Sequence, residues 1–234
     1  MNLYVKLIGS LAFFSGVASG LLSLTFAITA PVIAEREKED QEKALQNVFF
    51  LQGENGGGPL VPKPMAEGVT ALYASEDARQ PLYFAATGEG TGYNSAVPVT
   101  LMVGFTGPAA AADLLKGYVP NDRLPPAGGK ERYIVGFSVI KSEETPGLGE
   151  RVKDSRPPFT MGELLTGNAP PANPDKATPF QSQFRGRTAG SLALKKGGGD
   201  LDAITAATIT SNGVLAAIRN ADEKLAGALS APPK

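Results

Sequence analysis

The chain has 234 residues, of which 42% are hydrophobic and 19% charged, and its 22 basic and 23 acidic side chains give a net charge of -1. These values fit one folded domain with an appendage, and they offer no basic surface for nucleic acid. Cys and His are both absent. Their absence excludes disulfides, thiolate nucleophiles and the usual ligands of zinc, iron–sulfur clusters and haem. A carboxylate site for calcium or magnesium stays open, but no metal site is predicted, and an organic cofactor is the natural carrier for any redox chemistry.

An uncharged apolar run extends from Leu7 to Ala30. As a helix it would span roughly 36 Å at about 1.5 Å per residue, enough to cross a hydrocarbon core of about 30 Å. A cleaved signal peptide is the alternative, but its apolar region is usually about 7–15 residues long. The sequence therefore predicts an N-terminal tail and transmembrane anchor over residues 1–34.

The segment after the anchor is first charged and then amphipathic. A kink is expected at Pro31, and Val32 to Gln52 predicts a helix with Ala44, Leu45, Val48 and Phe49 on one face. A glycine-rich run follows it. We therefore expect a juxtamembrane helix and linker over residues 35–58 and a globular domain over residues 59–234.

The globular domain is predicted to be α+β, with a mostly antiparallel sheet and flanking helices. β-Branched and aromatic residues indicate strands, and these are expected over Val69–Ala74, Pro81–Thr87, Val97–Phe105 and Arg132–Lys141. Residues 109–118 predict a short helix. An apolar stripe at helical spacing predicts the last helix from about Ser211 to Leu229.

Two motifs carry the candidate chemistry. The first, DAITAATITS from Asp202 to Ser211, places hydroxyls and small side chains at the mouth of the last helix. Such a pattern is typical either of a helix cap or of a phosphate site, because the first N–H groups of a helix lack partners within it. The second, EETPGLG from Glu143 to Gly149, follows a strand and has the residues of a tight turn.

Both motifs, in this order, resemble the FMN-binding domain family. Its members include the G subunit of the Rnf ion-translocating ferredoxin:NAD oxidoreductase and the C subunit of the sodium-pumping NADH:quinone reductase. The family's acceptor pattern is Asp, two variable residues, Ser or Thr, usually Gly, then Ala and the acceptor Thr. Asp202, Thr205, Ala207 and Thr208 match this pattern, whereas Ala206 replaces the usual glycine.

The resemblance implies that a flavin transferase moves FMN from FAD onto the Thr208 hydroxyl as a phosphoester. Asp202 then belongs to the sequence that the transferase recognises, and Thr210 is the reserve acceptor. Further residues are implied to contact the cofactor: Thr205 and Ala207 beside the acceptor, and Glu144, Thr145, Gly147 and Leu148 near the isoalloxazine ring. The GTGYN segment, Gly90 to Asn94, resembles a loop of the same family less specifically.

The resemblance further implies an electron-transfer subunit of the Rnf type, a redox carrier that is not catalytic on its own. It would be a single-pass protein of the bacterial cytoplasmic membrane, with its domain on the extracytoplasmic side and the other membrane and peripheral subunits of the complex as partners. Two alternatives stay open. One is the C subunit of a sodium-pumping quinone reductase, and the other is a flavin-free, membrane-anchored assembly module.

Overall fold

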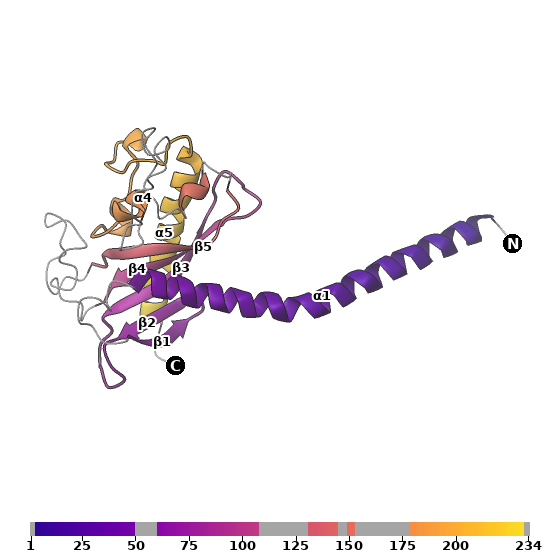
Figure 1. The fold of residues 1–234 in the computed structure, drawn as a ribbon, viewed down its shortest axis with the longest axis horizontal. Coiled ribbons are helices and arrows are strands. Elements are labelled where there is room, and N and C mark those ends of the chain that lie inside the picture. Colours follow the sequence, from indigo (N-terminus) through magenta and orange to yellow (C-terminus); the bar gives the residue numbers. More distant parts are fainter. Residues whose placement is uncertain (1–2, 50–59, 108–130, 145–148, 153–177, 232–234) are drawn as a thin grey trace, which may run out of the picture. The chain divides into compact units, whose positions relative to one another are not determined.

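The computed structural model describes residues 3–49, 60–107, 131–144, 149–152 and 178–231 (Figure 1). In chain order, the elements within these ranges are α1 (Leu3–Phe49), β1 (Val61–Ala66), β2 (Val69–Tyr73), β3 (Tyr83–Gly90), β4 (Val99–Thr106), β5 (Ile134–Lys141), η3 (Gly149–Val152), α4 (Pro179–Ser182), η4 (Ala189–Ser191), η5 (Lys195–Gly197) and α5 (Thr208–Ser230). The prediction of an α+β domain preceded by one long apolar helix is confirmed.

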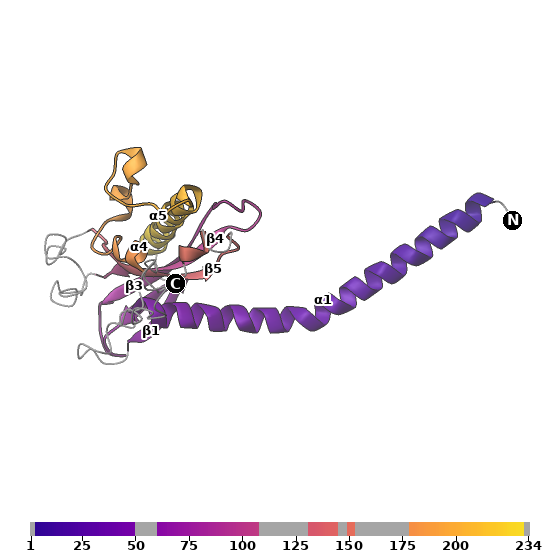
Figure 2. The ribbon, with the colours of Figure 1, turned by 45° about the horizontal axis from the view of Figure 1, so that its top comes forward.

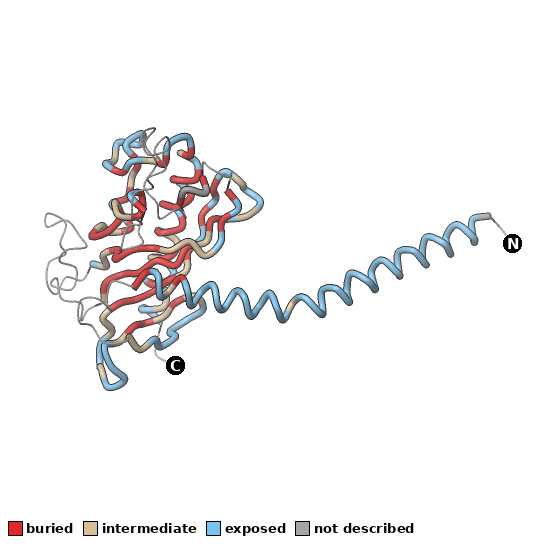
Figure 3. Tube along the Cα trace, viewed as in Figure 1, coloured by how far each residue is buried: buried red, intermediate tan, exposed pale blue. Residues whose placement is uncertain are grey.

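The chain divides into two compact units, Met1–Glu42 and Lys43–Lys234. The described part of the first unit is helical throughout and contains Pro31 without a break in α1. Its large apolar side chains are exposed, as the pale-blue course of α1 in Figure 3 shows. Among the described residues, α1 alone is long and apolar enough to cross a membrane. Exposed apolar surface of this extent needs an apolar environment to cover it.

Within the described part of the second unit, five antiparallel strands form one sheet in the order β1-β2-β3-β4-β5. Each strand therefore pairs with its neighbour in sequence, as expected for a meander. The hairpin predicted for β2 and β3 is confirmed, with Val69 opposite Ala86 and Leu72 opposite Tyr83. The strands predicted around β4 and β5 are also confirmed, and these two pair along most of their length.

Both faces of the sheet are covered (Figure 2). Along β3, Phe84 and Ala86 point into the larger core cluster, which contains the apolar side of α5. Tyr83 and Ala85 point to the opposite face, where Val48 from the end of α1 is buried with them. The amphipathic face predicted for the second half of α1 is therefore confirmed. Alternation of buried residues on β3 fits a strand that is covered on both sides.

The contact between α5 and β3 is made by very small residues. A Cβ built on Gly90 would lie 1.9 Å from the Gly213 carbonyl oxygen, and one built on Gly88 would lie 1.9 Å from the Ala217 carbonyl oxygen. The helix backbone thus rests almost directly on the strand backbone. This close packing fixes the first turns of α5 against the end of β3, where the candidate site lies.

Two features differ from the sequence-based expectation. Strand β1 was not predicted, because Pro62 and Pro64 disfavour strands, yet an edge strand tolerates proline where its N–H would face away from the sheet. The last helix begins at Thr208 and not near Ser211, so that prediction was wrong by about one turn. The helix predicted over residues 109–118 lies outside the described residues.

Candidate functional site

The candidate site surrounds the N-terminus of α5. Ala207 is the N-cap residue of this helix and supplies no side-chain hydrogen bond to its first turn. The Ala207 N–H itself donates to the Ile204 carbonyl at 2.9 Å, which closes the turn that leads into the helix. A helix end without a side-chain cap keeps free donors and the positive end of the helix dipole available to an anion.

Ser211 fixes this turn to the helix. Its hydroxyl accepts a hydrogen bond from the Ile204 N–H and donates one to the Ala207 carbonyl, both at 2.9 Å. Ser211 is fully buried, so these bonds replace contacts with water that the groups cannot make. Sequence reasoning took Ser211 as the start of the helix and missed this role.

Ala206 adopts a left-handed backbone conformation, with a φ of 62°, and it is the one non-glycine residue with positive φ among those described. This conformation costs an L-residue about 1–2 kcal/mol relative to glycine. The family resemblance places the usual glycine at this position. The turn therefore needs the left-handed conformation, and in this chain Ala206 adopts it at a cost.

We expect Ala206→Gly to raise the free energy of unfolding by about 0.5–1 kcal/mol, because relief of the strained φ outweighs the added freedom of glycine in the unfolded chain. Thermal and urea unfolding of the detergent-solubilised protein, followed by circular dichroism, would measure the change. The matched control is Gly190→Ala, an exposed position with nothing within 4 Å of the added Cβ. Destabilisation by Ala206→Gly would contradict the assignment of strain to this turn.

Glu144 connects the site to two other segments. Its Oε2 accepts a hydrogen bond from the Thr210 hydroxyl at 2.5 Å and one from the Tyr93 N–H at 3.3 Å. Glycines enclose the carboxylate: a Cβ on Gly149 would lie 2.8 Å from Oε2, and one on Gly92 would lie 2.0 Å from Oε1. Glu144 thereby joins the segment after β3, the segment after β5 and the first turn of α5.

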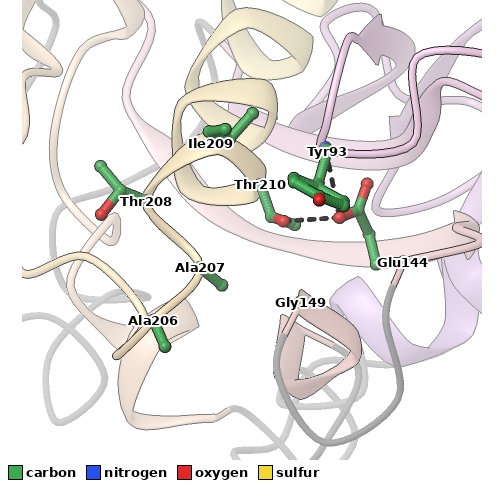
Figure 4. Close-up of a pocket in the computed structure, with 8 residues that line it drawn as sticks. All are labelled: Tyr93, Glu144, Gly149, Ala206, Ala207, Thr208, Ile209 and Thr210. Carbon is green, nitrogen blue, oxygen red and sulfur yellow. Dashed lines mark hydrogen bonds between the residues drawn. The ribbon is translucent and has the colours of Figure 1, made fainter.

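A pocket of about 470 Å³ lies among these segments (Figure 4). The described residues that line it are Tyr93, Glu144, Gly149, Ala206, Ala207, Thr208, Ile209 and Thr210. Figure 4 shows the Thr210 and Glu144 side chains pointing toward one another, while the Thr208 hydroxyl points away from this pair. Thr208 is half-buried and Thr210 is buried, so the two threonine hydroxyls of the first turn differ in both exposure and partners.

The structure brings four of the predicted site residues to the pocket, namely Ala207, Thr208, Thr210 and Glu144. Thr205 is exposed in the preceding turn and is not among the described residues that line the pocket. Asp202 is exposed as well, and it forms an ion pair with Lys195 at 2.7 Å. Thr145, Gly147 and Leu148 lie outside the described residues.

Sequence reasoning did not assign Tyr93, Gly149 and Ile209 to the site. Tyr93 belongs to the GTGYN segment, and Gly149 ends the EETPGLG motif, so both were quoted without a role of their own. Tyr93 is 68% exposed and Ile209 is 54% exposed. Two large apolar side chains so exposed beside a pocket are typical of a ligand or partner surface.

The residues present suit FMN, an organic cofactor with a phosphate. No group of three or more metal-ligating side chains occurs among the described residues. The uncapped start of α5 suits a phosphate, and the half-buried Thr208 hydroxyl at the first helical position can carry one. The pocket size falls within the range of small-molecule sites.

Comparison with known proteins agrees with this geometry. Residues 128–223 match the FMN-binding domain. The G subunit of the ion-translocating oxidoreductase complex of Methanosarcina acetivorans is 27% identical over 220 residues, covering 92% of this chain and 91% of that protein. The G subunit from Pseudomonas aeruginosa is 29% identical over 217 residues, covering 90% and 83%, and that from Aliivibrio fischeri is 25% identical over 214 residues, covering 90% and 85%.

Proposed function

Because the chain is homologous to the G subunits of ion-translocating oxidoreductase complexes over nearly its whole length and contains a match to the FMN-binding domain, we propose that it is the membrane-anchored electron-transfer subunit of such a complex. It carries FMN bonded through its phosphate to Thr208. The observation that supports this function best is the position of Thr208, at the uncapped start of α5 and among the residues that line the pocket.

Attachment needs a nucleophilic oxygen that a transferase can reach. Thr208 Oγ1 would supply the oxygen that bonds to the FMN-side phosphorus of FAD, the pyrophosphate bond would break with AMP as the leaving group, and the hydroxyl proton would pass to the transferase and solvent. No hydrogen bond joins the Thr208 hydroxyl to another described residue. Thr210, by contrast, is buried and donates to Glu144, which favours Thr208 over the reserve acceptor. Asp202 is exposed beside the turn, as a recognition residue should be.

The protein's part in electron transfer is to hold and orient the cofactor. FMN supplies the redox chemistry when bound, and the chain contributes its attachment, electrostatics and access. The first turn of α5 and its dipole stabilise the phosphate. Tyr93 and Ile209 supply apolar surface at the pocket. A covalent bond retains the cofactor where free FMN could not be replenished.

The anchor and its orientation belong to the same proposal. The exposed apolar helix α1 suits a single membrane span. We place the domain on the extracytoplasmic side of the bacterial cytoplasmic membrane, where the flavin transferase and the other membrane and peripheral subunits of the complex are its partners. This placement follows the family resemblance, since the charges that flank the span do not set the orientation.

Expression of the full chain in an exporting host, with and without the flavin transferase, tests the proposal. We expect a band in the membrane fraction that fluoresces under ultraviolet light after denaturation and is present only with the transferase. The bound flavin should be reduced by dithionite and reoxidised by air. An accepted substrate of the same transferase serves as the positive control. A colourless protein beside a labelled control would favour the flavin-free assembly module.

A further inference from the structure

Glu144 is an unusual group in the pocket because it is a buried carboxylate whose acceptor capacity is only partly used. It is 6% exposed, and both of its described hydrogen bonds end on Oε2. Oε1 is buried and has no hydrogen-bond partner among the described residues. Leaving a buried polar atom without a partner costs about 1–3 kcal/mol, and more for a charged group. The folded protein therefore bears the energetic cost of an unpartnered Oε1 in the wall of the pocket.

The surroundings hold the carboxylate in one place. Gly92 and Gly149 approach it so closely that a Cβ at either position would clash with its oxygens. The Thr210 hydroxyl at 2.5 Å fixes Oε2 from the first turn of α5. A side chain fixed by three segments of the chain is preorganised and does not adapt freely to a ligand. The position of the Glu144 carboxylate is therefore fixed by the surrounding fold.

The charge of Glu144 determines which part of a ligand it accepts. A phosphate would be repelled by the carboxylate, and the Thr208 hydroxyl that carries the phosphate points away from it (Figure 4). The attachment point of the phosphate and the carboxylate therefore face different ways from the first turn of α5.

Resting on the proposed attachment of FMN at Thr208, we propose that the Glu144 carboxylate lowers the reduction potential of the flavin. The physical reason is Coulombic. Reduction adds electrons to the flavin, and a negative charge in a pocket of low dielectric disfavours that addition. Glu144 is the one acidic side chain among the described residues that line the pocket.

Glu144→Gln tests the proposal, because it keeps the shape of the side chain and removes the charge. Each flavin-loaded, detergent-solubilised protein is first checked for covalent flavin by intact mass, and its midpoint potential is then measured by redox titration. We expect Glu144→Gln to keep the flavin and to titrate at a higher potential.

Two further variants separate charge from structure. Glu143→Gln makes the same change at the exposed neighbouring residue and should leave the potential unchanged. Thr210→Val removes the hydroxyl that partly neutralises the carboxylate, so it should lower the potential, opposite in sign to Glu144→Gln. If Glu144→Gln does not accumulate as folded protein, the potential of Thr210→Val still tests the proposal. Shifts of equal sign, or no shift beyond that of Glu143→Gln, would overturn the proposal, whereas absence of covalent flavin in the wild type would overturn the attachment itself.

Discussion

Replacing Thr208 by alanine should abolish covalent flavin completely, because the proposed phosphoester forms on the hydroxyl oxygen that alanine lacks. The helix should be unaffected, since alanine is the best helix former and Thr208 makes no side-chain hydrogen bond to a described residue. Thr208→Ser keeps a hydroxyl at the same place and should accept the flavin. Fluorescence of the denatured protein and its intact mass measure both outcomes.

The second threonine of the first turn is the matched control. Thr210→Val should retain the flavin, since the Thr210 hydroxyl is occupied by Glu144. Folding of each variant is checked by circular dichroism. Flavin that persists in Thr208→Ala and disappears in Thr210→Val would identify Thr210, the reserve acceptor, as the attachment residue.

Replacing Gly90 by alanine should lower the free energy of unfolding by about 3 kcal/mol or more, at the upper end of overpacking effects. The new Cβ would lie 1.9 Å from the Gly213 carbonyl oxygen and 2.7 Å from the Ala217 nitrogen. Both neighbours are backbone atoms of α5, so no side-chain rotation relieves the clash. The helix must move away from β3, and the first turn that carries Thr208 moves with it.

Gly227→Ala is the control for this prediction. Gly227 lies on the same helix, with nothing within 4 Å of an added Cβ. Alanine there should stabilise the protein by about 0.5–1 kcal/mol through helix propensity. Urea unfolding followed by circular dichroism compares the two variants. Equal and small effects would show that the close packing of α5 on β3 does not limit stability.

Sequence patterns predicted most of the sheet, because alternation and β-branched residues mark β2 to β5 clearly. They did not predict β1, where Pro62 and Pro64 mask a strand that only the edge position permits. The start of α5 was also missed. Its first residues are β-branched and weak helix formers, and the Ser211 hydrogen bonds that stabilise the turn before them are visible only in the structure.

The site was predicted in part for a similar reason. The acceptor motif is continuous in sequence, so the resemblance gave Thr208 and its neighbours directly. The contact between Glu144 and Thr210 joins residues 66 positions apart, and the one between Tyr93 and Glu144 joins residues 51 positions apart. No local pattern contains either contact. The left-handed Ala206 was likewise hidden, although the usual glycine of the family marks its position.

The most direct measurement of the central claim is the location of the flavin by tandem mass spectrometry. Cleavage after Lys196 and Arg219 gives one peptide, residues 197–219, that contains the whole acceptor motif. If Thr208 carries the flavin, this peptide has the added mass of the FMN phosphoester. In its fragment series, read from either end, the added mass first appears at Thr208. A peptide without this mass, from protein that has passed through the transferase, would contradict the account.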